Sequence, residues 1–165
     1  MADLTAYGIT VDVPPTWEGR IFTRPESGQV AINAFDGEPA PPGERTNPLV
    51  QLSTVPMPVV VGDFGSGVVE QLEPKDLFIV VKEFDPSSAT TPLFRRPGLP
   101  LPLDPEEFSP NALQRTLPGQ AGVQIFYNQL GGAYCVYVVL GSFARRVPLA
   151  ETASDVLATL RVTPR

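Results

Sequence analysis

The residue types that most often carry out catalysis are scarce in this chain. Its 165 residues include no histidine, so neither a Ser-His-Asp nor a Cys-His arrangement can form, and the commonest transition-metal ligand is missing. The one cysteine, Cys135, stands in a strand-like apolar run, and one thiol builds neither a zinc site nor an intramolecular disulfide. Nothing near it in sequence would lower its pKa, which favours a small buried hydrophobe over a nucleophile. We therefore expect no catalytic residue, no cofactor and no metal site.

Two other patterns suggest chemistry at first sight. The run GDFGSG at 62–67 is rich in glycine, but its spacing matches neither the dinucleotide fingerprint nor the Walker A loop, so a tight turn is favoured. Carboxylates of the kind that form acid/base pairs or bind calcium are spread along the chain: Asp63, Glu70, Glu73, Asp76, Glu106 and Glu107. Their offsets differ from those of an EF-hand loop, which favours a solvated acidic surface.

Three residues remain as candidates for binding. Trp17 follows the Pro14-Pro15 bend; it is either a binding anchor or, more commonly, a side chain packed over the end of a hairpin. Arg145 and Arg146 follow an apolar strand. If they continue that strand, they point to opposite faces. They then either pair with a carboxylate such as Glu151 or contact an anion or an acidic partner, for which the guanidinium fork is well suited.

Charge and hydropathy narrow the class of partner. The net charge of −6 argues against nucleic acid and against an anionic membrane surface, because both require basic patches. No stretch reaches the roughly 18 apolar residues of a membrane-spanning helix. The start, Met-Ala-Asp-Leu-Thr-Ala, has neither a basic nor an apolar signal region. We therefore expect a cytoplasmic protein with a protein partner and no membrane insertion; the oligomeric state stays open.

Hydrophobic periodicity predicts the elements that must position these residues. Period-two or apolar runs predict strands at 7–13, 17–24, 30–35, 50–61, 77–84, 123–130 and 133–142. The run 50–61 contains two prolines, so it is predicted as an edge strand or an interrupted one. The run 77–84 is predicted as a buried central strand. Two glycines, Gly131 and Gly132, separate the last two runs and predict a hairpin with a primed turn.

Helices and loops complete the expected architecture. Apolar spacing predicts an amphipathic helix at 149–160, followed by a short strand. Short helices are expected at 66–72, with Ser66 as N-cap, and at 111–115, with Ser109 as N-cap. The segment 36–48 lacks apolar anchors and is predicted to be mobile, whereas the proline-rich segment 85–110 carries six large apolar residues and should lie against the body. The prediction is one α+β domain over 1–165, a mainly antiparallel sheet of six to seven strands with a C-terminal helix and one or two short helices.

Three features together resemble a known fold group. A strand runs into a Pro-x-x-Trp bend at 14–17, an aromatic and β-branched hairpin lies near the C-terminus, and an amphipathic helix closes into a Leu-Arg-Val strand at 160–162. This combination resembles the PsbP/Mog1-like fold, as in the DcrB and LpqN groups of small bacterial proteins. The resemblance implies a bacterial protein with a non-catalytic accessory or binding role. Many bacterial members are exported lipoproteins, whereas this chain has neither a signal segment nor a lipobox cysteine.

Two functional hypotheses follow. The first is a non-catalytic accessory or protein-interaction domain that works through a surface. The second is a small-ligand binding protein, or an atypical enzyme without histidine, that uses a carboxylate/arginine pocket between the sheet and the proline-rich segment. A pocket with convergent arginine and carboxylate groups would favour the second, and an exposed apolar patch would favour the first.

Overall fold

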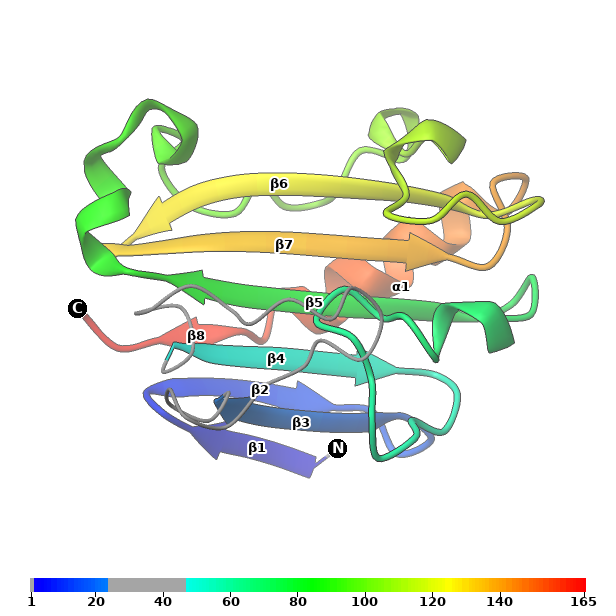
Figure 1. Ribbon diagram of the computed structural model, residues 1–165, viewed down its shortest axis with the longest axis horizontal. Helices are drawn as coiled ribbons and strands as arrows, with labels where there is room; N and C mark the ends of the chain where they lie inside the picture. Colours follow the sequence, from blue (N-terminus) through cyan, green and yellow to red (C-terminus); the bar gives the residue numbers. More distant parts are fainter. Residues whose placement is uncertain (1, 24–46) are drawn as a thin grey trace.

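The computed structural model describes residues 2–23 and 47–165, which form an α+β structure (Figure 1). Their strands make two antiparallel sheets, of order β3-β4-β5-β7-β6 and β1-β2-β8. The elements are β1 (Ala2–Ala6), β2 (Ile9–Val13), β3 (Glu18–Thr23), β4 (Pro48–Ser53), β5 (Leu77–Phe84), β6 (Ala121–Gln129), β7 (Gly132–Leu140), α1 (Arg146–Leu157) and β8 (Arg161–Val162). Short 3-10 turns are η1 (Val69–Gln71), η2 (Pro86–Thr90), η3 (Pro92–Phe94), η4 (Pro105–Glu107) and η5 (Pro110–Ala112). The predicted fold class is confirmed.

The five-stranded sheet is buried on both faces. On β5, Ile79 faces one apolar cluster and its neighbour Val80 faces a second cluster, because successive side chains of a strand point to opposite sides. β5 lies between β4 and β7, as predicted for a central strand. Every residue of β7 is buried. A strand covered on both faces reads as a continuous apolar run, which is why these two elements are so clear in the sequence.

One face of this sheet carries α1 and the three-stranded sheet. Figure 1 shows α1 crossing behind β5 and β7, and its Leu149 and Val156 join the same apolar cluster as Ile9 of β2. The helix begins at Arg146, three residues earlier than its apolar spacing indicates. Pro148 lies in its first turn, where a backbone N–H has no partner within the helix. Pro148 therefore belongs to the helix, and the preceding strand β7 ends eight residues earlier, at Leu140.

The other face is covered by loops. The Gln51 side chain, fully buried on β4, donates to the carbonyls of Gly62 and Asp63 at 3.0 and 3.2 Å and so holds the GDFGSG turn against the sheet. The short helix predicted after Ser66 is one 3-10 turn, and Val68 occupies the N-cap position without a side-chain hydrogen bond. The Ser66 cap is thus wrong. The Ser109 cap is confirmed, because its side chain accepts from the Asn111 N–H at 3.1 Å.

Two strand predictions need correction. The run 50–61 contributes only β4, which ends at Ser53, before the prolines, so the alternative of an interrupted strand is confirmed and that of an edge strand is wrong, because β4 lies between β3 and β5. The run 7–13 begins at Ile9, because Tyr7 and Gly8, with φ of 54° and 78°, form the turn of a hairpin with the additional strand β1. The predicted strand at 30–35 lies outside the described residues, and so does most of the segment 36–48 predicted to be mobile.

The β6–β7 hairpin has the expected primed turn, shifted by one residue. Leu130 and Gly131 are its two central residues, with φ of 48° and 82°, and Gln129 pairs with Gly132. Both central positions of a type I′ turn need positive φ. Gly132 therefore belongs to β7 rather than to the turn, and there its missing side chain leaves space for the Tyr134 ring.

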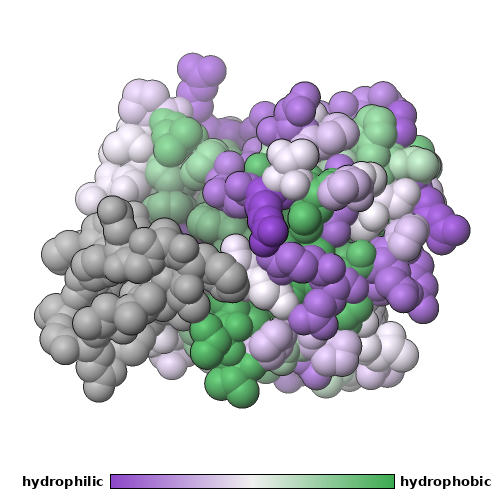
Figure 2. All heavy atoms as spheres, turned by 45° about the vertical axis from the view of Figure 1, so that its right-hand side comes forward, coloured by the Kyte–Doolittle hydropathy of each residue, from purple (hydrophilic) through white to green (hydrophobic). Residues whose placement is uncertain are grey.

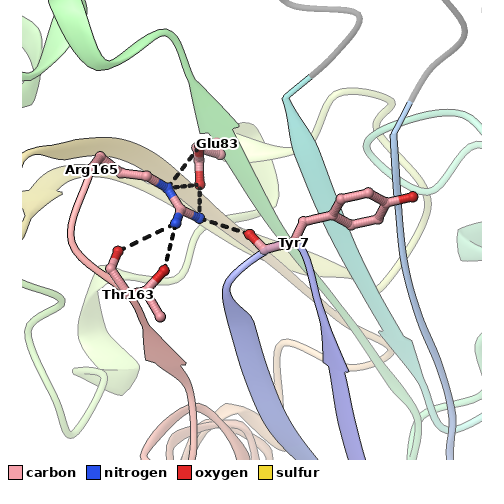
Figure 3. A network of polar contacts seen from close by, with 4 residues as sticks. All are labelled: Tyr7, Glu83, Thr163 and Arg165. Atoms are coloured by element: carbon pink, nitrogen blue, oxygen red, sulfur yellow. Dashed lines mark hydrogen bonds and ion pairs between the residues drawn. The ribbon is translucent and has the colours of Figure 1, made fainter.

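An arginine ties the two sheets together near the C-terminal end (Figure 3). Arg165 donates to Glu83 of β5, with its shortest contact at 2.6 Å, to the Thr163 hydroxyl at 2.8 Å and to the Tyr7 carbonyl at 3.0 Å. We call Tyr7, Glu83, Thr163 and Arg165 the C-terminal clasp. The hydrogen bond to Glu83 raises the pKa of Arg165 above its ordinary value. The clasp joins the β1–β2 turn to a central strand of the larger sheet.

Candidate functional site

Among the residues that the structure describes, the outer side of the edge strand β6 is paired with other segments only at its two ends. Gly122 exchanges two backbone hydrogen bonds of 3.0 Å with Ser109. At the other end, the Asn128 N–H donates to the Arg96 carbonyl at 2.8 Å, and its carbonyl accepts from the Gly98 N–H at 2.7 Å. Two parts of the proline-rich segment thus close the edge at these points.

Between these ends, two residues present unpaired backbone groups. Backbone N–H and C=O groups of alternate strand residues point to the same side, so Gln124 and Phe126 point outward as Gly122 and Asn128 do. Neither has a backbone hydrogen-bond partner on this side within 2–23 and 47–165. An edge of this kind can pair with an added strand.

The proline-rich segment is fixed at both ends of this stretch by buried side chains and hydrogen bonds. Near Asn128, Phe94 is buried and its ring lies 5.5 Å from the Phe126 ring, while the Asn128 side chain donates to the Phe94 carbonyl. Near Gly122, Phe108 is buried. Aromatic contacts and buried side chains therefore hold the two flanks apart, and the segment lies against the body as its apolar content predicts.

A groove of about 660 Å³ follows the open stretch. Residues 124–126 of β6 line it, together with Leu93, Arg95, Arg96 and Glu107 of the proline-rich segment. We call this groove and its lining residues the β6 slot. Figure 1 shows β6 at the margin of the sheet, with the 3-10 turns of the proline-rich segment at its two ends.

Charge differs between the two ends of the β6 slot. Arg95 and Arg96 stand at the Asn128 end and are exposed, and no ion pair joins either to another described residue. Glu107 stands on the other flank, likewise exposed and without an ion pair in the described part of the chain. The slot therefore offers cationic groups at one end and an anionic group at the other.

The surface in Figure 2 carries its apolar residues in several small groups separated by hydrophilic ones. The large exposed apolar side chains come from separate segments: Tyr7, Val59, Val60, Leu93, Leu101, Leu130 and Val147. Binding through one broad apolar patch therefore has little support on this side, whereas Leu93 places apolar surface at the slot itself.

The predicted binding residues lie in two different places. The Trp17 side chain is partly buried against the core at the β2–β3 bend, and the backbone N–H of Trp17 donates to the Pro14 carbonyl at 3.0 Å. Trp17 is therefore packed, but at a bend that connects the two sheets rather than over a hairpin end, because β2 and β3 belong to different sheets. It lies next to β3, the strand at the opposite edge of the sheet from β6. The structure therefore does not bring Trp17 to the slot.

Arg145 and Arg146 lie at the start of α1 rather than in a strand, so the expectation that they point to opposite faces of a sheet is wrong. Arg145 is exposed at the N-cap position. The Arg146 guanidinium stacks over the Phe143 ring at 4.3 Å and pairs with Glu106 at 3.4 Å, whereas Glu151 was the expected partner. Arg146 thus contacts η4, the turn that also carries Glu107 of the β6 slot.

The groups considered for catalysis and metal binding are placed as follows. Cys135 is fully buried in β7, and burial raises the pKa of its thiol to about 11. It is a weak nucleophile at neutral pH. Among the described residues, no three His, Cys, Asp or Glu side chains converge as a metal site would need. With 12 residues, α1 is too short to cross a bilayer, and no helix in the described part of the chain is long and apolar enough to do so.

A second cavity lies on the α1 side of β6. Its volume is about 320 Å³, and Leu99, Leu101, Tyr127, Gln129, Leu157 and Leu160 line it, with no charged side chain. Tyr127 is fully buried, and its hydroxyl has no hydrogen-bond partner among the described residues. Burial raises the pKa of Tyr127 well above its ordinary value. We call this cavity the Tyr127 pocket.

Comparisons with family models, curated proteins and solved structures return no match. The resemblance to the PsbP/Mog1-like fold, and the bacterial origin it implies, therefore stay expectations.

Sequence reasoning missed the slot residues. Gln124 and Phe126 appear within one of two similar apolar runs, and nothing in either run indicates which strand lies at the edge. Arg95 and Arg96 stand in the proline-rich segment, whose apolar residues predict docking but not where it docks. The usable signal was an exposed polar residue, Gln124, inside a run that is otherwise strand-like.

Proposed function

We propose that this chain is a non-catalytic interaction domain that binds an extended segment of a partner protein in the β6 slot. The observation that supports this is the pair of unpaired residues, Gln124 and Phe126, held open between two fixed flanks. An extended segment added to such an edge gains main-chain hydrogen bonds, and the flanking side chains select its sequence. A cytoplasmic location and a protein partner belong to the proposal and are supported by the net charge and the single buried cysteine.

The test uses two substitutions at one position. Gln124→Pro removes the outward N–H, while a proline whose nitrogen faces away from the ladder is compatible with an edge strand. Gln124→Ala removes the same side chain and keeps the N–H. Wild type and both variants are used to capture partners from a native lysate, and hydrogen exchange is measured on the purified complex. We expect Gln124→Ala to retain the partner, Gln124→Pro to lose it, and the amides of Gln124 and Phe126 to become protected in the wild-type complex. Equal capture by both variants would exclude the slot.

Small-ligand binding is the second candidate function, and the Tyr127 pocket favours it. Because no charged group lines this pocket, and burial keeps the Tyr127 hydroxyl protonated, its ligand should be uncharged, mainly apolar and able to accept one hydrogen bond. The arginine and carboxylate groups expected for a ligand pocket line the β6 slot, but they stand at its two opposite ends and do not converge, so they do not favour a small ligand there.

The probe for this candidate is 2-heptanone, followed through the methyl resonances of Leu157 and Leu160. Saturable shifts are expected, with heptanoate as the charged control that gives none. Tyr127→Phe should weaken 2-heptanone binding by up to about tenfold, as expected for the loss of one hydrogen bond. Identical titrations of wild type and Tyr127→Phe would remove the hydroxyl from the proposal.

A further inference from the structure

We infer that the β6 slot takes its partner segment antiparallel to β6 and selects an order of charge along it, with acidic residues first, an apolar residue opposite Phe126, and basic residues last. The inference rests on the proposed function and names the chemistry of the partner. It follows from the hydrogen-bonding pattern, from the positions of the flanks and from the charges at the two ends of the slot.

The flanks set the direction. In an antiparallel pair, two opposite residues exchange both backbone hydrogen bonds, so partner residues opposite Phe126 and Gln124 satisfy all four outward groups within a span of three residues. In a parallel pair, each residue bonds to the two partner residues on either side of the one opposite it. Satisfying the same four groups therefore takes a span of about five partner residues. Its two outer residues would lie opposite Val123 and Tyr127, positions that Phe108 and Arg96 already occupy through the bridges of Ser109 with Gly122 and of Pro97 with Asn128. Antiparallel binding fits the free length.

The antiparallel direction determines which residues of the partner segment pass each charged end of the slot. Antiparallel to β6, the partner enters at the Asn128 end and leaves at the Gly122 end. Its N-terminal residues therefore pass Arg95 and Arg96, and its C-terminal residues pass Glu107. The slot therefore favours acidic residues at the N-terminal end of the partner segment and basic residues at its C-terminal end. Each then faces an opposite charge that lacks an ion-pair partner among the described residues.

The side chain opposite Phe126 should be apolar. Opposite residues of an antiparallel pair point to the same face, so this side chain lies beside the Phe126 ring. Leu93, which is 59% exposed, lines the same groove. A β-branched residue suits both the extended backbone and this apolar contact.

A second copy of this chain does not fit through its own β6. If Gln124 of one copy lay opposite Phe126 of the other, Gly122 would lie opposite Asn128. At those positions Ser109 of one copy and Gly98 of the other already occupy the edge. The occupant must therefore be a single extended segment that is free of neighbouring strands on its near side.

Two peptides test the order of charge. The fluorescein-labelled amide Glu-Glu-Val-Thr-Val-Lys-Lys matches the slot, and Lys-Lys-Val-Thr-Val-Glu-Glu carries the same symmetrical core with the charges exchanged. Fluorescence anisotropy in low salt should show that the first peptide binds about fivefold to tenfold more tightly, because only its complex forms a few exposed pairs of opposite charge. The difference should shrink in high salt, which screens exposed charges.

A charge-exchanged protein sharpens the test. Arg95→Glu, Arg96→Glu and Glu107→Lys in one variant should reverse the preference, so that the second peptide binds more tightly. Gln124→Pro should abolish binding of both peptides, and Gln124→Ala should keep the preference. These side chains are exposed and unpaired in the described structure, so circular dichroism should show the triple variant folded.

The outcomes separate this inference from the proposed function. The predicted order of charge is wrong if the two peptides bind equally, or if the triple variant keeps the wild-type preference. If Gln124→Pro still abolishes binding in that case, the β6 slot is retained as the binding site. If Gln124→Pro binds both peptides as the wild type does, the slot itself is wrong. Failure of both peptides to bind overturns the inference, and so does a homodimer in sedimentation that Gln124→Pro dissociates.

Discussion

The C-terminal clasp and the β6 slot use the same kinds of groups in opposite ways. In the clasp, the Arg165 guanidinium bonds to Glu83, Thr163 and the Tyr7 carbonyl, and Glu83 is only 4% exposed. In the slot, two arginines, a glutamate and the backbone groups of two strand residues face a groove, with none of these groups satisfied by another described residue. Groups that saturate one another contribute to folding, whereas unsaturated groups held in place are available for a partner. The comparison predicts that substitutions in the clasp change stability and that those in the slot change binding.

The largest effect is expected at the clasp. Arg165→Met leaves the buried Glu83 carboxylate without its ion-pair partner, which typically costs about 3–5 kcal/mol. Urea unfolding should show this loss of free energy relative to wild type. Arg161→Met, on the exposed side of β8, is the matched control and should change the free energy of unfolding by less than about 0.5 kcal/mol. Equal effects of the two substitutions would show that the clasp is not a stabilising network.

The next effect contrasts two neighbouring residues of β6. Ile125 directs its backbone toward β7, where it pairs with Val136, so Ile125→Pro should remove a ladder hydrogen bond and cost about 3 kcal/mol or more. Gln124→Pro removes a donor that points outward and should cost less than about 1 kcal/mol. Both are measured by urea unfolding. If Gln124→Pro is as damaging as Ile125→Pro, the Gln124 N–H is not free and the slot is misplaced.

The sequence predicted the interior of this fold better than its margins. β5 and β7 were identified because a strand buried on both faces consists almost entirely of apolar residues, and α1 because its apolar residues repeat with helical spacing. β1 was missed, since its alternating residues Asp3 and Thr5 are polar and most of the strand is exposed. The prolines of the run 50–61 suggested an edge strand or an interrupted one, but β4 ends before them, and pairing with β3 and β5, which no local pattern shows, places it inside the sheet.

The candidate site was less predictable for the same reason. Its groups come from β6 and from two separate parts of the proline-rich segment, which meet only because Phe94 and Phe108 are buried at different ends of one strand. The partner of Arg146 was predicted from sequence proximity as Glu151, but the contact that forms is with Glu106, 40 residues away. Local patterns identify elements, and long-range packing decides which side chains meet.

The third prediction concerns how stability depends on pH through Tyr134, which lies near Glu83 of the clasp. Burial, followed by the negative charge of Glu83, raises the pKa of Tyr134 to about 12. Because the folded pKa is above the unfolded value of about 10, this tyrosine contributes stability that is complete below pH 10 and is lost as pH rises toward 12. We expect the melting temperature to fall over that interval, by the equivalent of about 1 kcal/mol at pH 11. Tyr134→Phe should show a shallower fall, and an unchanged slope would contradict the assignment.

The smallest effect on stability is expected at the arginine pair. Arg145 is exposed, and the pair between Arg146 and Glu106 is 74% exposed on the glutamate side, so it should contribute at most about 1 kcal/mol. Arg145→Ala with Arg146→Ala should therefore lower the melting temperature by no more than about 2–4 °C. Arg115→Ala, which breaks the exposed pair with Glu70, is the matched control.

The same double variant tests whether these arginines contact an acidic partner. Arg146 holds η4, whose Glu107 forms the anionic end of the β6 slot, so a purely positional role predicts weaker binding of the basic end of the peptide and retained binding of a shorter peptide without lysines. Direct contact with an acidic partner predicts that capture is abolished while the melting temperature stays near that of Arg115→Ala. A melting temperature several degrees below that of Arg115→Ala would show that Arg145 and Arg146 have a structural role, and normal capture would show that they have no role in binding. In either case the β6 slot is the binding site that the interaction-domain proposal keeps.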